Sequence, residues 1–162
     1  MASLFCFALA CDLREDSPQQ VVDTLKYMTR SQDYEFDDPP DAEFFEGEDW
    51  RTFLTVEHEG FMFPGKAYVT FHSAYRYSRP MIHGGDDVYV YTLSLRCQSG
   101  DDGITDLIDF AEWLAPYSST QGFVGYIIYE GLETPSLIYF RNGQVYVSEP
   151  PQPHEINMGD AW

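Results

Sequence analysis

The stretch SLFCFALACDL, residues 3–13, decides the fold class of this chain. Its alternate positions carry one row of mainly large apolar side chains: Phe5, Phe7, Leu9, Cys11 and Leu13. The residues between them are also apolar or small: Leu4, Cys6, Ala8 and Ala10. A strand that is apolar on both faces belongs inside a sheet, with a neighbour on each side. We therefore expect residues 3–13 to form a central strand.

The rest of the chain repeats strand patterns around two amphipathic helices. Alternation predicts further strands over residues 50–58, 66–77, 88–97, 121–130, 136–141 and 144–148. A helix is expected to begin at Ser17-Pro18-Gln19-Gln20, with Ser17 as its N-cap, and to end near Arg30. A second helix follows Asp101-Asp102 and ends before Pro116. Asn142-Gly143 predicts a type I′ hairpin between the last two strands.

Strands outnumber helices and follow one another closely, which favours a mainly antiparallel sheet. The expected fold class is α+β, a two-layer sandwich with a sheet of five to seven strands. Two helices would cover one face of this sheet in a ferredoxin-like outline. Residues 1–149 would form a single domain with an acidic loop, residues 31–49, inserted in it. Residues 150–162 would form a proline-rich tail.

The charge of the chain limits the partners that it suits. Its 162 residues include 27 Asp or Glu and only 9 Lys or Arg, a formal net charge of -18. Such a surface disfavours direct binding to nucleic acid or to an anionic membrane, where basic side chains must neutralise phosphates. It favours a basic protein partner. A halophilic origin is an alternative explanation for the same acidity.

The negative charge is concentrated between Ser31 and Trp50, where nine carboxylates stand without one Lys or Arg. Five aromatic rings are interleaved with them, and these rings offer apolar area that a plain acidic linker does not need. The predicted partner-binding residues are Tyr34, Phe36, Asp37, Asp38, Phe44, Phe45 and Trp50. A solvated loop with its rings packed on the sheet is the alternative. A calcium loop is disfavoured because no glycine stands at the turn and Pro39-Pro40 interrupts the segment.

No motif of catalysis or of cofactor binding is recognisable. The four histidines are scattered, no cysteine pair completes a zinc site, and no nucleophile elbow is present. We expect no metal and no cofactor, and the chain is more typical of a binding protein than of an enzyme. The three cysteines are expected to be buried, reduced thiols, which suits a cytoplasmic protein.

The local concentration of positive charge at Arg76, Arg79 and Arg96 has two interpretations. These arginines are interpreted first as internal counter-charges for the acidic loop. Alternatively, a ligand pocket near residues 79–87 would use four polar side chains: His72, Arg76, Arg79 and His83.

The leading hypothesis is therefore a soluble, non-enzymatic interaction protein that binds a basic partner. Its small size, acidity and tyrosine content are those of immunity-type inhibitors of nucleases. A small-molecule-binding or enzymatic α+β domain is the second hypothesis. Self-association as a homodimer, through a tyrosine-rich strand face or a free edge, is the third.

Overall fold

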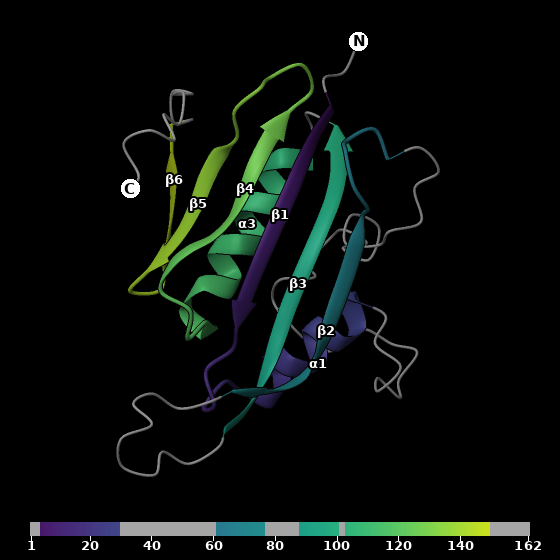
Figure 1. Ribbon diagram of the computed structural model, residues 1–162. Coiled ribbons are helices and arrows are strands. Elements are labelled where there is room, and N and C mark those ends of the chain that lie inside the picture. Colours follow the sequence, from purple (N-terminus) through teal and green to yellow (C-terminus); the bar gives the residue numbers. More distant parts are fainter. Residues whose placement is uncertain (1–3, 30–60, 77–87, 101–102, 150–162) are drawn as a thin grey trace, which may run out of the picture.

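Six antiparallel strands form one sheet in the order β2-β3-β1-β4-β5-β6 in the computed structural model, which describes residues 4–29, 61–76, 88–100 and 103–149 (Figure 1). The strands are β1 (Leu4–Asp12), β2 (Tyr68–Arg76), β3 (Val88–Gly100), β4 (Gly122–Tyr129), β5 (Ser136–Arg141) and β6 (Gln144–Ser148). The helices are α1 (Gln19–Met28) and α3 (Ile104–Leu114), and the 3-10 turn η4 (Ala115–Tyr117) continues α3. The strand predicted over residues 50–58, the acidic loop and the tail lie outside the described residues.

The expected fold class is confirmed. One helix follows β1 and the other follows β3, and the strand order β2-β3-β1-β4 with antiparallel neighbours is the ferredoxin-like arrangement. The β5–β6 hairpin extends the sheet beyond β4. Figure 1 shows α1 and α3 on the same side of the sheet. We call this side the helix face and the opposite side the open face.

The core fills the space between the helix face and the helices. The row of β1 side chains predicted from the sequence is buried there: Phe5, Phe7, Leu9, Cys11 and Leu13. Helices α1 and α3 meet it with an apolar stripe each: Val21, Val22, Leu25, Met28, Leu107, Phe110, Ala111 and Leu114. Full burial of one such large side chain contributes about 1.5–3 kcal/mol, so this layer is the main source of stability.

The middle of strand β1 is also buried on its open face. Cys6 is 0% exposed and Ala8 is 7% exposed, although neither of the described helices lies on this face, and Ala10 is exposed. The strand lies between β3 and β4, as its two apolar faces predicted. All three cysteines, Cys6, Cys11 and Cys97, are free and buried. Burial raises the pKa of both Cys11 and Cys97 to about 12, so these thiols stay protonated.

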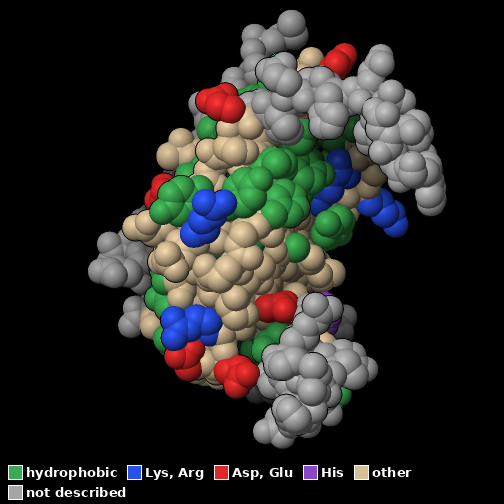
Figure 2. Space-filling view, turned by 60° about the vertical axis from the view of Figure 1, so that its left-hand side comes forward, with side chains coloured by type: hydrophobic (Ala, Val, Ile, Leu, Met, Phe, Trp, Pro, Cys, Tyr) green, Lys and Arg blue, Asp and Glu red, His purple; other side chains and the backbone are tan. Residues whose placement is uncertain are grey.

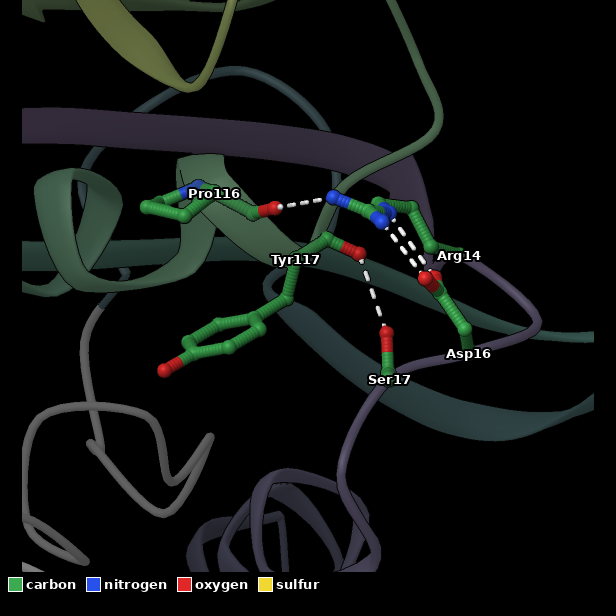
Figure 3. A network of polar contacts seen from close by, with 5 residues as sticks. All are labelled: Arg14, Asp16, Ser17, Pro116 and Tyr117. Atoms are coloured by element: carbon green, nitrogen blue, oxygen red, sulfur yellow. Dashed lines mark hydrogen bonds and ion pairs between the residues drawn. The ribbon is translucent and has the colours of Figure 1, made fainter.

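The join between β1 and α1 corrects one prediction. The N-cap of α1 is Pro18 and no side chain caps the helix, so Ser17 is not the N-cap. The Ser17 hydroxyl donates to the carbonyl oxygen of Tyr117 at 3.2 Å (Figure 3). Arg14 holds the same join, because its side chain forms a two-bond ion pair with Asp16 at 2.8 and 2.6 Å. These contacts tie the start of α1 to η4, and the exposed ion pair adds little stability of its own.

The hairpin prediction at Asn142-Gly143 is confirmed. Both residues have positive φ, 52° and 74°, as a type I′ turn requires. The turn pairs Arg141 with Gln144 and sets the register of β5 and β6.

A close approach between strands generates the first testable prediction. The register of β4 shifts between Phe123 and Gly125, and a β-carbon at Gly125 would overlap the carbonyl oxygen of Ala8 in β1. We expect Gly125→Ala to lower the free energy of unfolding by about 2–3 kcal/mol, because the backbone of a central strand would have to move. Urea unfolding measures this change.

Gly100→Ala is the matched control for that substitution. Gly100 is also a strand glycine beside β1, and a β-carbon there would meet nothing within 4 Å. Its unfolding midpoint should stay close to that of the wild type. Equal midpoints for the two variants would contradict the proposed overlap at Gly125.

Candidate functional site

The structure describes only part of the predicted site. The predicted partner-binding set lies wholly outside the described residues: Tyr34, Phe36, Asp37, Asp38, Phe44, Phe45 and Trp50. Of the predicted ligand-binding set, Arg79 and His83 also lie outside them. His72 is exposed on β2, and Arg76 is the last residue of the same strand. His72 lines neither of the cavities given below, and the predicted pocket around it stays a prediction because residues 77–87 lie outside the described residues.

An arginine of β3 organises the open face. The Arg96 side chain donates from Nε to the Tyr126 hydroxyl at 3.0 Å and from Nη1 to the Lys66 carbonyl oxygen at 3.2 Å. Its guanidinium lies 4.9 Å from the centroid of the Phe61 ring. A charged group in this position over a ring is attracted by the π electrons. We call Arg96, Tyr126, Phe61 and Lys66 the Arg96 cluster.

The Arg96 cluster contributes to the burial of Cys6 on the open face. Arg96 and Tyr126 lie opposite Ala8, in the strands on either side of β1. Both side chains also interact with the Cys6 thiol. Burial raises the pKa of Cys6, and the nearby charge of Arg96 partly opposes that increase. Arg96 and Tyr126 therefore cover Cys6, and Phe61 stacks on Arg96.

The two ends of the acidic region lie on opposite faces of the sheet. Thr29 follows α1 and bonds to the Leu25 carbonyl oxygen in the helix layer. Phe61 stacks on Arg96, and the backbone N–H of Met62 donates to the Gln98 side chain at 2.7 Å. Residues 30–60, which carry eleven carboxylates and two arginines, thus connect the helix layer to the open face.

A second aromatic group lies on the open face near the β5–β6 hairpin. The Arg141 guanidinium lies 5.5 Å from the ring centroid of Tyr139 and 5.9 Å from that of Tyr146. Tyr139 also meets the Phe123 ring edge-on at 6.0 Å. Phe123 and Tyr146 are 56% and 48% exposed. We call these four residues the tyrosine–arginine patch.

Figure 2 looks at the molecule from the side of β5 and β6 and shows hydrophobic side chains gathered in a band, with basic side chains beside it. A single exposed aromatic residue needs no explanation, but a group of rings around a cation is typical of interaction surfaces. The open face therefore offers apolar contact area at the tyrosine–arginine patch.

Two cavities are lined by described residues. One of about 340 Å³ lies between Glu112 of α3 and residues 143–146 of the hairpin. The other, of about 280 Å³, lies between residues 62–64 and residues 128–132. Each is at or below the small end of ligand pockets. Glu112, Gln144 and Tyr146 are the polar side chains that line the first, and the Tyr146 hydroxyl donates to Gln144 Oε1 at 2.9 Å.

The negative charge of the protein is unevenly distributed. The described residues hold ten Asp or Glu and six Lys or Arg, which is a net charge of -4 out of -18. The remaining -14 belongs to residues 1–3, 30–60, 77–87, 101–102 and 150–162. The described residues are thus close to electrically balanced, and most of the net negative charge belongs to the other residues, above all to residues 30–60.

Metal-binding and membrane-spanning features are the next question for the described residues. Within the described ranges, no three His, Cys, Asp or Glu side chains are grouped so that they could hold a metal ion. No helix among these residues is long and apolar enough to cross a membrane. The chain matches no family model, no curated protein and no solved structure.

The tyrosine–arginine patch was not predicted from the sequence, although the sequence contains a signal for it. The Asn142-Gly143 turn places Tyr139 directly opposite Tyr146, with Arg141 two residues from Tyr139 on the same face. The role of Arg96 had no such local signal, because Phe61 and Tyr126 lie 35 and 30 residues away from it in the sequence. The interpretation of Arg96 as a counter-charge stays a prediction, since the acidic loop is outside the described residues.

The Arg96 cluster leads to the second testable prediction. Arg96→Met keeps an apolar stem but removes the stacking on Phe61 and the bond to Tyr126. These contacts contribute about 2 kcal/mol together, so the cover over Cys6 should open roughly thirtyfold more often. We expect a thiol reagent to label Cys6 faster by that factor, with the labelled site identified by mass spectrometry.

Arg141→Met is the control for the Cys6 experiment. Arg141 also stacks on aromatic rings but has no described contact with Cys6. Its labelling rate should equal that of the wild type. Equal acceleration at Cys6, Cys11 and Cys97 in Arg96→Met would indicate global unfolding and would contradict a local cover.

Proposed function

We propose that this protein is a non-enzymatic interaction protein that binds a basic protein partner through its acidic segments, in the manner of an immunity-type inhibitor. The observation that supports this proposal is the separation of charge along the sequence. Residues 31–50 alone carry nine carboxylates and no Lys or Arg, whereas the described residues together have a net charge of -4. An acidic surface that served only solubility would have no need of such a division.

The composition of residues 31–50 fits recognition of a cationic surface. Nine carboxylates in one stretch produce a strong local field, which raises the rate of encounter with a basic protein. The five rings between them supply the apolar contact area that binding energy requires, since charged rims contribute mainly to rate and specificity. We therefore assign steering to the carboxylates and anchoring to Tyr34, Phe36, Phe44, Phe45 and Trp50.

A cytoplasmic location is part of the proposal. Cys6, Cys11 and Cys97 are free and buried, and Cys6 lies on the opposite face of β1 from Cys11. Free thiols without disulfides are typical of reducing compartments.

The third testable prediction concerns salt. A basic probe, poly-L-lysine of defined length, should bind the protein at low ionic strength and lose at least roughly tenfold in affinity between about 0.05 and 0.5 M salt, because screening shortens the range of the field. Isothermal titration calorimetry measures the affinity. Affinity purification from the native host at low salt, followed by mass spectrometry, identifies the natural partner.

An amide variant tests whether the acidic loop carries the binding. Its nine substitutions are D33N, E35Q, D37N, D38N, D41N, E43Q, E46Q, E48Q and D49N. This variant should lose most of its affinity for the probe and for the purified partner, and should keep the far-ultraviolet circular dichroism of the wild type. The protein's fold should not depend on these charges, since like charges in one segment repel.

The matched control neutralises six exposed carboxylates of the described fold: Glu15, Asp109, Glu112, Glu130, Glu133 and Glu149. It should bind nearly as tightly as the wild type. If each variant lost affinity in simple proportion to its charge, the binding would be non-specific and the proposal would be wrong.

A further inference from the structure

Strand β6 presents a free edge among the described residues. It pairs with β5 on one side, and no described strand pairs with its other side. Its sequence, Gln144-Val145-Tyr146-Val147-Ser148, contains no charge and no proline, and its register with β5 has no bulge. Proteins usually protect exposed edges with such features, because unpaired main-chain groups recruit another strand. Their absence from β6 suggests that this edge is used.

The register of the hairpin tells which main-chain groups face outward. In a two-residue hairpin the pair beside the turn exchanges two hydrogen bonds, and that pair is Arg141 with Gln144. Bonded pairs alternate along the ladder, so residues 144, 146 and 148 bond to β5. The N–H and C=O groups of Val145 and Val147 therefore point to the free edge.

The sequence of β6 is symmetric about its central residue. It has the form polar-Val-Tyr-Val-polar. We propose that a second copy of this chain pairs with this edge, so that two β6 strands lie antiparallel and Tyr146 sits on the two-fold axis. Val145 of one copy then faces Val147 of the other, and each pair exchanges two main-chain hydrogen bonds.

Side-chain exposure agrees with this arrangement. Val147 and Tyr146 are 49% and 48% exposed, although both are large and apolar. In the pairing, the valines of both copies extend the apolar helix face, and the two Tyr146 rings meet on the open face. A non-bonded pair such as Tyr146 with itself brings its side chains closest together. A strand of unrelated sequence would not place valine opposite valine and tyrosine opposite tyrosine.

The charge of the chain predicts how this dimer behaves. Two copies of a chain with net charge -18 repel each other, so added salt should strengthen their association. The interface of two five-residue strands is small, and we expect a weak dimer with a Kd on the order of 100 μM. The salt dependence is opposite in sign to that of binding a basic partner, so the two activities are separable.

The decisive test is a cross-link that depends on register. In the proposed pairing the Cα atoms of the two Tyr146 residues are about 4.5 Å apart, within the range of a disulfide. Tyr146→Cys should form a covalent dimer under mild oxidation. Gln144→Cys is the control, because Gln144 faces Ser148 of the other copy and lies several residues away from its own equivalent. The three native cysteines are buried and should not contribute.

Sedimentation equilibrium provides the second measurement. The wild type should associate more strongly at about 0.5 M salt than at about 0.05 M. Val147→Pro removes the outward N–H of Val147, which does not bond to β5. Because both copies carry the substitution, two of the four main-chain hydrogen bonds between them are lost, and the Kd of the dimer should rise roughly thirtyfold. Val147→Thr keeps the N–H and the branched side chain, and its dimer should resemble that of the wild type.

Several outcomes would overturn the proposal. A monomer at all concentrations and salt levels would do so, as would equal cross-linking of the Gln144→Cys and Tyr146→Cys variants. Cross-linking to another protein in place of a second copy would show that the edge serves a different strand, which is also contrary to the proposal. None of these outcomes bears on the basic partner, because no substitution in β6 alters a carboxylate.

Discussion

The burial of β1 on both of its faces is the constraint on which the rest of the structure depends. Its large side chains require the helices on one side, and Cys6 and Ala8 require cover on the other. A strand with these needs must lie inside the sheet, between β3 and β4. The two helices satisfy the first requirement. Arg96 and Tyr126 contribute to the second, and Phe61 and the Lys66 carbonyl oxygen hold the Arg96 side chain in place.

Features fixed by neighbouring residues could be predicted from the sequence. The double apolar pattern of β1 indicated its central position, and Asn142-Gly143 indicated the hairpin and its register. Features fixed by distant residues could not. Ser17 has the chemistry of an N-cap, but its hydroxyl bonds to Tyr117, 100 residues away in the sequence. Gly125 is visible as a glycine, but only the packing of β4 against Ala8 shows why no larger residue fits.

The candidate site divides in the same way. The concentration of carboxylates and rings over residues 31–50 is a property of composition, and it is apparent without coordinates. The neighbours of Arg96 are not, because residues 61–66 and strand β4, two segments distant from β3 in the sequence, supply them. His72 stands exposed on β2, and its predicted pocket stays a prediction because residues 77–87 are outside the described residues. Residue chemistry read along the chain therefore misses surfaces that are built across strands.

The distribution of charge along the chain bears on both proposed forms of recognition. Attraction to a basic surface needs negative charge in one place, whereas the approach of two copies needs a place where that charge is lowest. A uniformly acidic surface would weaken both. In this chain nine carboxylates stand between Ser31 and Trp50, and β6 carries no charge. Tyr146 stacks on Arg141, which further reduces the local negative potential. Ionic strength would then select between the two proposed interactions. Screening weakens the binding of a basic partner and favours the pairing of two copies.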